Sequence, residues 1–283
     1  MFYTTLVSTD DLARHLEDPH WVVVDCRFTL TDTEAGRQAY LKGHIPGARY
    51  AHLDEDLSAP IAPDTGRHPL PDVQTLTERL CSWGIGVNKQ VVVYDDAFGA
   101  MAVRLWWLLR WLGHPGVALL DGGYPKWVRE HRPVTHEICR TECKGACASL
   151  PERSMHATAA EVAQAMQASE KLILDARPDR RFTGEYEPLD PVAGHIPGAV
   201  NWMFDENLDL DGTFMPPEAL RENYQALLKG RAPSDVIHMC GSGVTACHNI
   251  LAMEIAGLSG SRLYVGSWSE WITDPSRPIA TGE

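Results

Sequence analysis

The chain has 283 residues, of which 44% are hydrophobic and 22% charged, values that are ordinary for a globular protein. Its formal net charge is −13, which argues against nucleic acid or an anionic membrane surface as the main partner, because both attract clustered positive charge. The N-terminus does not have the pattern of a signal peptide, and no apolar run approaches the ~20 residues that span a bilayer. We therefore expect a cytoplasmic protein whose seven cysteines are reduced thiols.

Helices and strands alternate along the first half of the chain. Residues 6–16 predict a helix, with Ser8 or Thr9 as its N-cap, and residues 21–24 form the continuous apolar run of a buried parallel strand. Further on, the pattern predicts a strand, a strongly apolar helix with three core tryptophans, and another strand, at residues 91–94, 102–112 and 117–120. This alternation indicates an α/β fold with a mainly parallel sheet.

The periodicity stops at residues 130–156, which predict a linker that runs over the surface. The segment contains Cys139, Cys143 and Cys147, each separated from the next by three residues. This spacing matches no common zinc pattern, so we interpret these cysteines as structural or incidental thiols rather than metal ligands. We expect neither a metal nor a cofactor.

The second half of the chain repeats the first. The sequence Gly-His-Ile-Pro-Gly-Ala occurs at residues 43–48 and again at 194–199, and in each half it follows an apolar run that ends in Asp-x-Arg. Six identical residues in the same order indicate a tandem duplication, which predicts domains at 1–132 and 157–283 joined by a linker at 133–156. Because both halves contain the motif histidines and the Asp-x-Arg pairs, we assign these residues to the scaffold.

The two halves differ in the loop after one strand, where the second half has Cys240 and the first half has Asp95. Cys240 comes at the C-terminal end of a strand, before a glycine-rich turn into a helix, which is where open α/β sheets bind ligands. Backbone N–H groups in such a turn point inward and the helix N-terminus adds positive potential, so the pKa of the thiol should be lowered. We interpret Cys240 as a nucleophile, with a buried structural cysteine as the alternative, and we expect the first half to be inactive.

A thiolate in such a loop can act in more than one way. It could hydrolyse phosphate esters, but the sixth residue after Cys240 is Ala246 rather than arginine, and residues 241–249 contain no cation that would bind a phosphoryl group. It could instead accept a sulfane sulfur as a persulfide held by the loop N–H groups, which requires no arginine in the loop. A third hypothesis is a non-catalytic persulfide carrier or sensor that uses Cys240 and Cys247.

The duplicated unit, the two His-Ile-Pro-Gly-Ala turns and the loop at residues 240–245 resemble the two-domain sulfurtransferases of the rhodanese superfamily over nearly the whole chain. The resemblance implies two tandem rhodanese-like domains, each a mainly parallel sheet flanked by helices, of which only the second is catalytic. It also implies ping-pong transfer of sulfur, through a Cys240 persulfide, to cyanide or to a thiol acceptor such as a thioredoxin-like protein. The uncharged loop is similar to that of 3-mercaptopyruvate enzymes, so we expect this donor, with thiosulfate as the alternative.

The resemblance also implies roles for particular side chains. Ser242 would help to activate the thiol or to protonate the departing enolate, and Arg181 matches the carboxylate-binding arginine of the family. The expected binding residues for substrate and persulfide are Gly241, Gly243, Val244, Thr245, Arg181, Arg67 and His68.

Two positions depart from the mercaptopyruvate pattern. Leu189 stands where a second arginine is expected, and Ala59 stands where an acidic residue is expected. Arg67 and His68 could reach the site from the first domain and substitute for them. The alternative interpretations are an ordinary surface histidine at position 68 and a solvated arginine at position 181.

Overall fold

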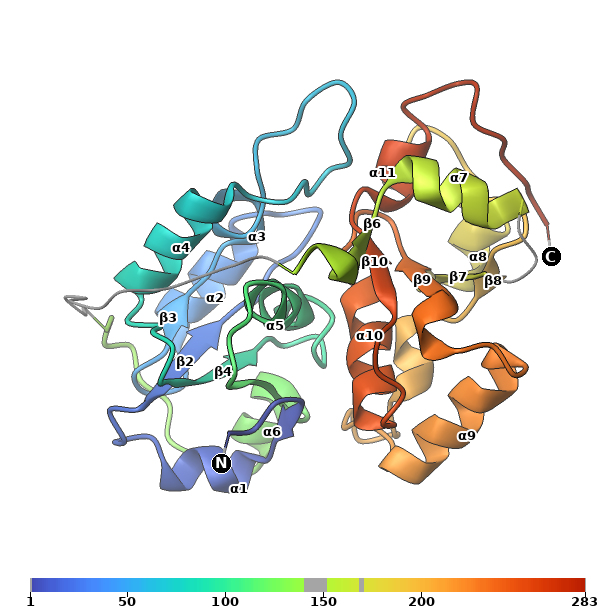
Figure 1. Ribbon diagram of the computed structural model, residues 1–283. Coiled ribbons are helices and arrows are strands. Elements are labelled where there is room, and N and C mark those ends of the chain that lie inside the picture. Colours follow the sequence, from blue (N-terminus) through green and yellow to red (C-terminus); the bar gives the residue numbers. More distant parts are fainter. Residues whose placement is uncertain (1, 140–151, 168–170, 283) are drawn as a thin grey trace. The chain divides into compact units, whose positions relative to one another are not determined.

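The computed structural model describes residues 2–139, 152–167 and 171–282, and it divides into two compact units (Figure 1). Unit 1 comprises Met1–Ala59, Leu70–Glu152 and Asp209–Phe214, and unit 2 comprises Pro60–Pro69, Arg153–Leu208 and Met215–Glu283. The segment Pro60–Pro69 therefore packs with unit 2, although it lies in the first half of the sequence. The domain boundaries at residues 132 and 157 stay a prediction.

Unit 1 contains a five-stranded sheet in the order β1-β5-β4-β2-β3, in which every pair of neighbouring strands is parallel. Its strands are β1 (Leu6–Val7), β2 (Trp21–Asp25), β3 (Arg49–Tyr50), β4 (Gln90–Tyr94) and β5 (Val117–Leu120). Its helices are α1 (Thr9–Arg14), α2 (Ala35–Lys42), α3 (Leu53–Asp56), α4 (Val73–Ser82), α5 (Ala102–Trp111) and α6 (Gly123–Arg129).

The predicted helix at residues 6–16 is wrong at its start. Leu6 and Val7 form strand β1, which pairs with β5. Helix α1 begins only at Thr9, because the Ser8 hydroxyl accepts a hydrogen bond from the backbone N–H of Asp11 (3.0 Å) and caps the first turn.

Unit 2 repeats this arrangement. Its parallel sheet has the order β6-β10-β9-β7-β8, the same order as in unit 1 when the strands are matched along the chain. The strands are β6 (His156–Ala157), β7 (Leu172–Asp175), β8 (Val200–Asn201), β9 (Val236–Met239) and β10 (Arg262–Tyr264). The helices are α7 (Ala159–Gln167), α8 (Asp179–Phe182), α9 (Pro217–Leu228), α10 (Ala246–Ile255) and α11 (Ser267–Trp271), with short 3-10 turns η1 (Arg153–Met155), η2 (Phe204–Asn207) and η3 (Pro233–Asp235). The predicted duplication and α/β fold class are confirmed.

Each sheet forms a core with the helices that flank it (Figure 1). The central strands β4 and β9 are buried along their whole length, including the polar residues Gln90 and His238. This agrees with a parallel sheet that is covered on both faces. Helix α5 is buried on nearly all sides, and its three tryptophans, Trp106, Trp107 and Trp111, are at most 5% exposed. These tryptophans therefore belong to the core, as predicted.

The Asp-x-Arg pairs tie strand ends to the Gly-His-Ile-Pro turns. In unit 2, Arg177 donates hydrogen bonds to the Asp175 carboxylate (2.7 Å) and to the carbonyl oxygen of Gly194 (2.8 Å), and Arg27 makes the equivalent contacts in unit 1. Both pairs are buried, which supports their assignment to the scaffold.

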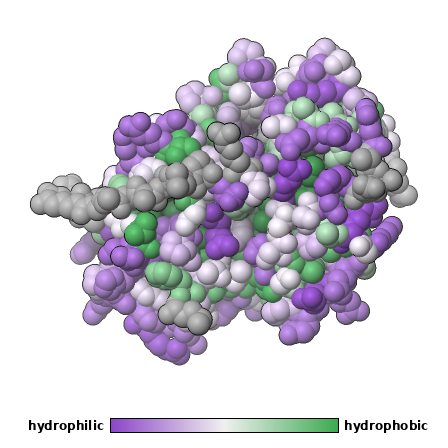
Figure 2. Space-filling view, in the orientation of Figure 1, coloured by the Kyte–Doolittle hydropathy of each residue, from purple (hydrophilic) through white to green (hydrophobic). Residues whose placement is uncertain are grey.

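The surface agrees with the charged composition. The face shown in Figure 2 is mostly hydrophilic, with hydrophobic residues scattered among charged ones. Among the described residues, no helix is both long enough and apolar enough to cross a bilayer.

Cys81 on α4 is disulfide-bonded, so the expectation that every cysteine is a reduced thiol is wrong at this position. Cys139 is half-buried, whereas Cys143 and Cys147 lie outside the described residues.

Candidate active site

Cys240 follows the last residue of β9 and lies in a loop that is held on both sides. Its backbone N–H donates to the Ser267 hydroxyl (3.1 Å), and its carbonyl oxygen accepts from the N–H of Trp268 (3.0 Å). Ser267 has a φ of +52°, a left-handed conformation that is uncommon for a side-chain-bearing residue and often marks a functional site. These contacts fix the Cys240 backbone against the start of α11.

The loop surrounds the Cys240 sulfur with hydrogen-bond donors. Burial raises the pKa of this thiol, because the residue is only 2% exposed, but hydrogen bonds to the sulfur lower it more, so that the pKa lies below its ordinary value. The donors are the Thr245 hydroxyl and the backbone N–H groups of Ser242, Val244 and Ala246. The thiolate is thus stabilised without a cationic side chain in the loop.

Gly243 allows the loop to curl. Its φ is +74°, and a Cβ at this position would lie 2.3 Å from the carbonyl oxygen of Val265. A larger residue would therefore have to move the loop away from the segment that follows β10, and with it the N–H groups that face the sulfur.

The equivalent loop of unit 1 has backbone donors at matching positions, but they surround a different side chain. The Asp95 carboxylate accepts hydrogen bonds from the backbone N–H groups of Ala97, Gly99, Met101 and Ala102, all at 2.8 Å. The first three donors lie two, four and six residues after Asp95, the same spacing as the backbone donors to the Cys240 sulfur. A carboxylate thus occupies in unit 1 the position that the sulfur occupies in unit 2.

Two arginines lie beside the residue that follows the cysteine. A Cβ on Gly241 would lie 2.9 Å from Nη2 of Arg67 and 3.3 Å from Nη2 of Arg181. Burial lowers the pKa of Arg67, and the neighbouring positive charge of Arg181 lowers it further. The structure therefore brings both predicted arginines to Cys240, and Arg181 is not a solvated residue, because its side chain is only 12% exposed.

Ser242 and His68 also meet at this site. The Nδ1 atom of His68 lies 2.7 Å from the Ser242 hydroxyl oxygen, and both residues are 4% exposed, so His68 is not an ordinary surface histidine. The segment that carries Arg67 and His68 is anchored on α11, where the backbone N–H of Arg67 donates to the Ser269 hydroxyl (3.0 Å).

Three other residues singled out in the sequence have different surroundings. Leu189 contributes its backbone N–H to the Glu187 carboxylate (3.0 Å), and its side chain brings no cation. Ala59 belongs to unit 1. Cys247 is fully buried on α10, with its sulfur 3.5 Å from the carbonyl oxygen of Gly243.

Sequence reasoning missed the two carboxylates that bind the arginines. Asp190 accepts from Nη2 of Arg181 (2.9 Å) and from Nη1 of Arg67, and Glu187 accepts from Nε of Arg181 (3.0 Å). The available signal was the presence of two acidic residues three positions apart, between the predicted arginine and the second Gly-His-Ile-Pro motif.

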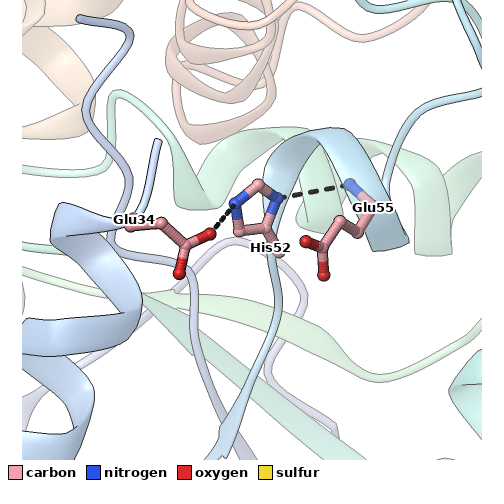
Figure 3. Close-up of side chains that lie close together, drawn as sticks. All are labelled: Glu34, His52 and Glu55. Atoms are coloured by element: carbon pink, nitrogen blue, oxygen red, sulfur yellow. Dashed lines mark hydrogen bonds and ion pairs between the residues drawn. The ribbon is translucent and has the colours of Figure 1, made fainter. Parts of the chain in front are cut away.

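One group of side chains has the composition of a metal site. Glu34, His52 and Glu55 in unit 1 bring potential ligand atoms within 4.8 Å of one another (Figure 3). However, Nδ1 of His52 accepts the backbone N–H groups at the start of α3, and Nε2 lies 3.0 Å from the carbonyl oxygen of Thr33. Arg37 pairs with both glutamates. The group is therefore explained as a helix cap with surface ion pairs.

The chain belongs to the rhodanese-like domain family, which it matches twice, at residues 8–130 and 158–274. It is 48% identical over 280 residues to a probable 3-mercaptopyruvate sulfurtransferase of Pseudomonas aeruginosa, with 98% of both chains covered. It is 34% identical over 282 residues to the thiosulfate sulfurtransferase of Bos taurus, with 96% of this chain and 93% of the relative covered.

Comparison with solved structures gives the same result. The 3-mercaptopyruvate sulfurtransferase from Leishmania major superposes with a TM-score of 0.83 at 29% identity, covering 95% of this chain and 74% of the other. SseA from Escherichia coli superposes with a TM-score of 0.81 at 31% identity, covering 94% and 100%. The predicted tandem of rhodanese-like domains is confirmed, and the prediction of a sulfurtransferase enzyme agrees with the names of these relatives.

Proposed function

We propose that the chain transfers a sulfane sulfur from 3-mercaptopyruvate, through a persulfide on Cys240, to cyanide or to a thiol. The observation that carries this proposal is a thiol with a lowered pKa, set in a loop of inward N–H groups with two guanidinium groups beside it. The thiol is the nucleophile, the N–H groups suit a transferred sulfur, and the guanidinium groups suit an anionic donor.

In the first half-reaction, the Cys240 thiolate attacks the donor sulfur. The new S–S bond forms as the donor C–S bond breaks, and the electron pair of that bond passes into the enolate of pyruvate. Protonation at carbon then gives pyruvate. Ser242 is the loop hydroxyl that can pass this proton, and its hydrogen bond to His68 holds it in place.

In the second half-reaction, the acceptor attacks the outer sulfur of the persulfide. The S–S bond breaks, its electron pair returns to Cys240 as a thiolate, and cyanide leaves as thiocyanate. Between the two steps, the backbone N–H groups that face the Cys240 sulfur, those of Ser242, Val244 and Ala246, also hold the outer sulfur, so that the loop needs no cation.

Thiosulfate is the second candidate donor. A specific observation favours it, because a second guanidinium, that of Arg67, lies beside Arg181 and would also suit a dianion. We favour 3-mercaptopyruvate because residues 241–245 contain no cationic side chain, and because two guanidinium groups can bind the carboxylate of a 2-oxo acid.

Two other functions are less consistent with this geometry. A phosphatase would need an arginine near the loop position that Ala246 occupies, and residues 241–249 contain no arginine or lysine. A non-catalytic carrier would not need a proton donor such as the pair formed by Ser242 and His68. The cytoplasmic location and a thioredoxin-like acceptor remain predictions.

The test compares both donors with the same enzyme. Steady-state kcat/KM should be higher with 3-mercaptopyruvate than with thiosulfate when cyanide is the acceptor. Incubation with donor alone should add the mass of one sulfur atom to the peptide that contains Cys240, and cyanide should remove it. Cys240→Ser should show neither the added mass nor turnover. Added sulfur on another cysteine, or turnover of neither donor, would contradict the proposal.

A further inference from the structure

Asp190 lies between the two arginines of the candidate site. Its side chain is 2% exposed, one carboxylate oxygen accepts from Nη1 of Arg67, and the other accepts from Nη2 of Arg181 (2.9 Å). Asp190 follows β7 and α8 in the chain, whereas Arg67 comes from the segment Pro60–Pro69. A single buried carboxylate therefore joins cations from two distant parts of the sequence within unit 2.

This bridge reduces the electrostatic repulsion between the two arginines. Two guanidinium groups side by side repel each other, and the positive charge of Arg181 is one of the causes that lower the pKa of Arg67, after burial. The Asp190 carboxylate lies between them and offsets this repulsion. Without it, the flexible Arg67 side chain would gain by moving towards solvent.

The bridge also orients the remaining donors. With Nη1 of Arg67 and Nη2 of Arg181 engaged by Asp190, the groups nearest to Gly241 are Nη2 of Arg67 and both terminal nitrogens of Arg181. Nη2 of Arg67 and Nη1 of Arg181 donate no hydrogen bond to any residue in the described ranges. They are the cationic donors available to an anion beside Cys240.

Asp190 also contributes to the net charge of the group of ion pairs around the two arginines. Three arginines and three carboxylates lie together here and balance one another: Arg67, Arg177, Arg181, Asp175, Glu187 and Asp190. Replacing the Asp190 carboxylate with a neutral group would leave one excess positive charge beside the thiolate. A dianionic donor would gain about twice as much from that charge as a monoanionic donor would.

We propose that Asp190 is a positioning residue that makes Arg67 and Arg181 into one clamp for a monoanionic 2-oxo carboxylate, and that its negative charge disfavours dianionic thiosulfate. This inference rests on the proposed sulfurtransferase function and deepens it, since it assigns donor selection to a carboxylate that acts through the two arginines it bridges.

The experiment measures kcat and KM for both donors in the full-length protein. Asp190→Asn, which keeps the shape but removes the charge, should raise the ratio of kcat/KM for thiosulfate to that for 3-mercaptopyruvate about tenfold, mainly through KM. Asp190→Glu should return the ratio towards the wild-type value. Glu222→Gln removes one negative charge from an exposed position on α9 and should leave the ratio unchanged.

A second variant keeps the test informative if Asp190→Asn folds poorly. Arg67→Gln removes one positive charge from the same clamp and should lower the same ratio. An active wild type whose ratio moves less than twofold in both variants would overturn the inference alone. A wild type that turns over neither donor would overturn the proposed function and the inference together.

Discussion

Replacing Arg181 with alanine tests the anion clamp most directly. The substitution removes one of the two guanidinium groups that lie beside Gly241, and it should raise the KM for 3-mercaptopyruvate. A hydrogen bond to a charged group is worth about 1.5–3 kcal/mol, which corresponds to an increase of roughly ten- to hundredfold. Because the carboxylate is bound equally before and during sulfur transfer, kcat should change much less than KM.

Arg181 pairs with both Glu187 and Asp190, so Arg181→Ala removes one ion-pair partner from each of these buried carboxylates. Glu187 and Asp190 have side chains only 3% and 2% exposed, and each keeps just one other arginine when Arg181 is removed. Breaking a buried ion pair costs about 3–5 kcal/mol, and the remaining arginines should hold the loss of stability near the lower end. Arg181→Lys keeps the charge but cannot contact both carboxylates as the guanidinium does. It should therefore be more stable than Arg181→Ala, with a KM between those of the wild type and Arg181→Ala.

The assay is steady-state formation of thiocyanate at varied donor concentration, with thermal unfolding of each variant measured in parallel. The kinetic comparison should be made well below the unfolding temperature of Arg181→Ala. If this variant is folded and its KM is unchanged for both donors, the assignment of Arg181 to donor binding is wrong, although membership of the family would stand.

Three further predictions concern the cysteine loop. Cys247→Ser should keep most of the activity that Cys240→Ser loses, because the Cys247 sulfur is buried against a loop carbonyl oxygen; equal loss in both would refute a single nucleophile. Gly243→Ala should lower kcat at least tenfold, because a Cβ at a φ of +74° lies 2.3 Å from a carbonyl oxygen and displaces the N–H groups; unchanged kcat would show that the cradle is dispensable. Because hydrogen bonds to the sulfur hold the pKa of Cys240 below that of an ordinary cysteine thiol, kcat/KM should rise with pH and level off at a lower pH than a free cysteine titrates, and the ultraviolet absorbance of the thiolate, taken as the difference from Cys240→Ser, should follow the same curve; a midpoint at or above that of free cysteine would contradict the hydrogen-bonded thiolate.

The internal repeat explains why most of the fold could be predicted. Buried parallel strands such as Gln90–Tyr94 leave a mainly apolar run in the sequence, and the equivalent strand Val236–Met239 repeats it in the second half. Strand β1 was missed because two residues are too few to show a period. Only the parallel pairing with β5, about 110 positions later in the chain, makes Leu6 and Val7 a strand.

From the residues alone, the candidate site was predictable only where its chemistry is local in sequence. Arg181 was expected from the resemblance to the family, and Arg67 and His68 were expected only as residues that could reach the site. The loop from Cys240 to Thr245 is one continuous motif, so its donors could be expected from glycine spacing alone. The contact between His68 and Ser242 joins residues 174 positions apart, and nothing in the local pattern shows that a proline-rich segment of the first half packs with unit 2. Asp190 was missed for a related reason, because its burial between two arginines depends on that same packing.

In unit 1, the Asp95 carboxylate occupies the anion-binding position of its own loop. Because the Asp95 carboxylate already accepts hydrogen bonds from the N–H groups of its own loop, an anion from solution cannot bind there. The loop is also held in place without a bound substrate. Any anion that competes with the donor at the Cys240 loop should therefore bind with a stoichiometry of one per chain, although the chain has two copies of the fold. If the proposed function holds, the duplication has produced one loop that receives a transferred sulfur and one loop whose equivalent position is filled by its own carboxylate.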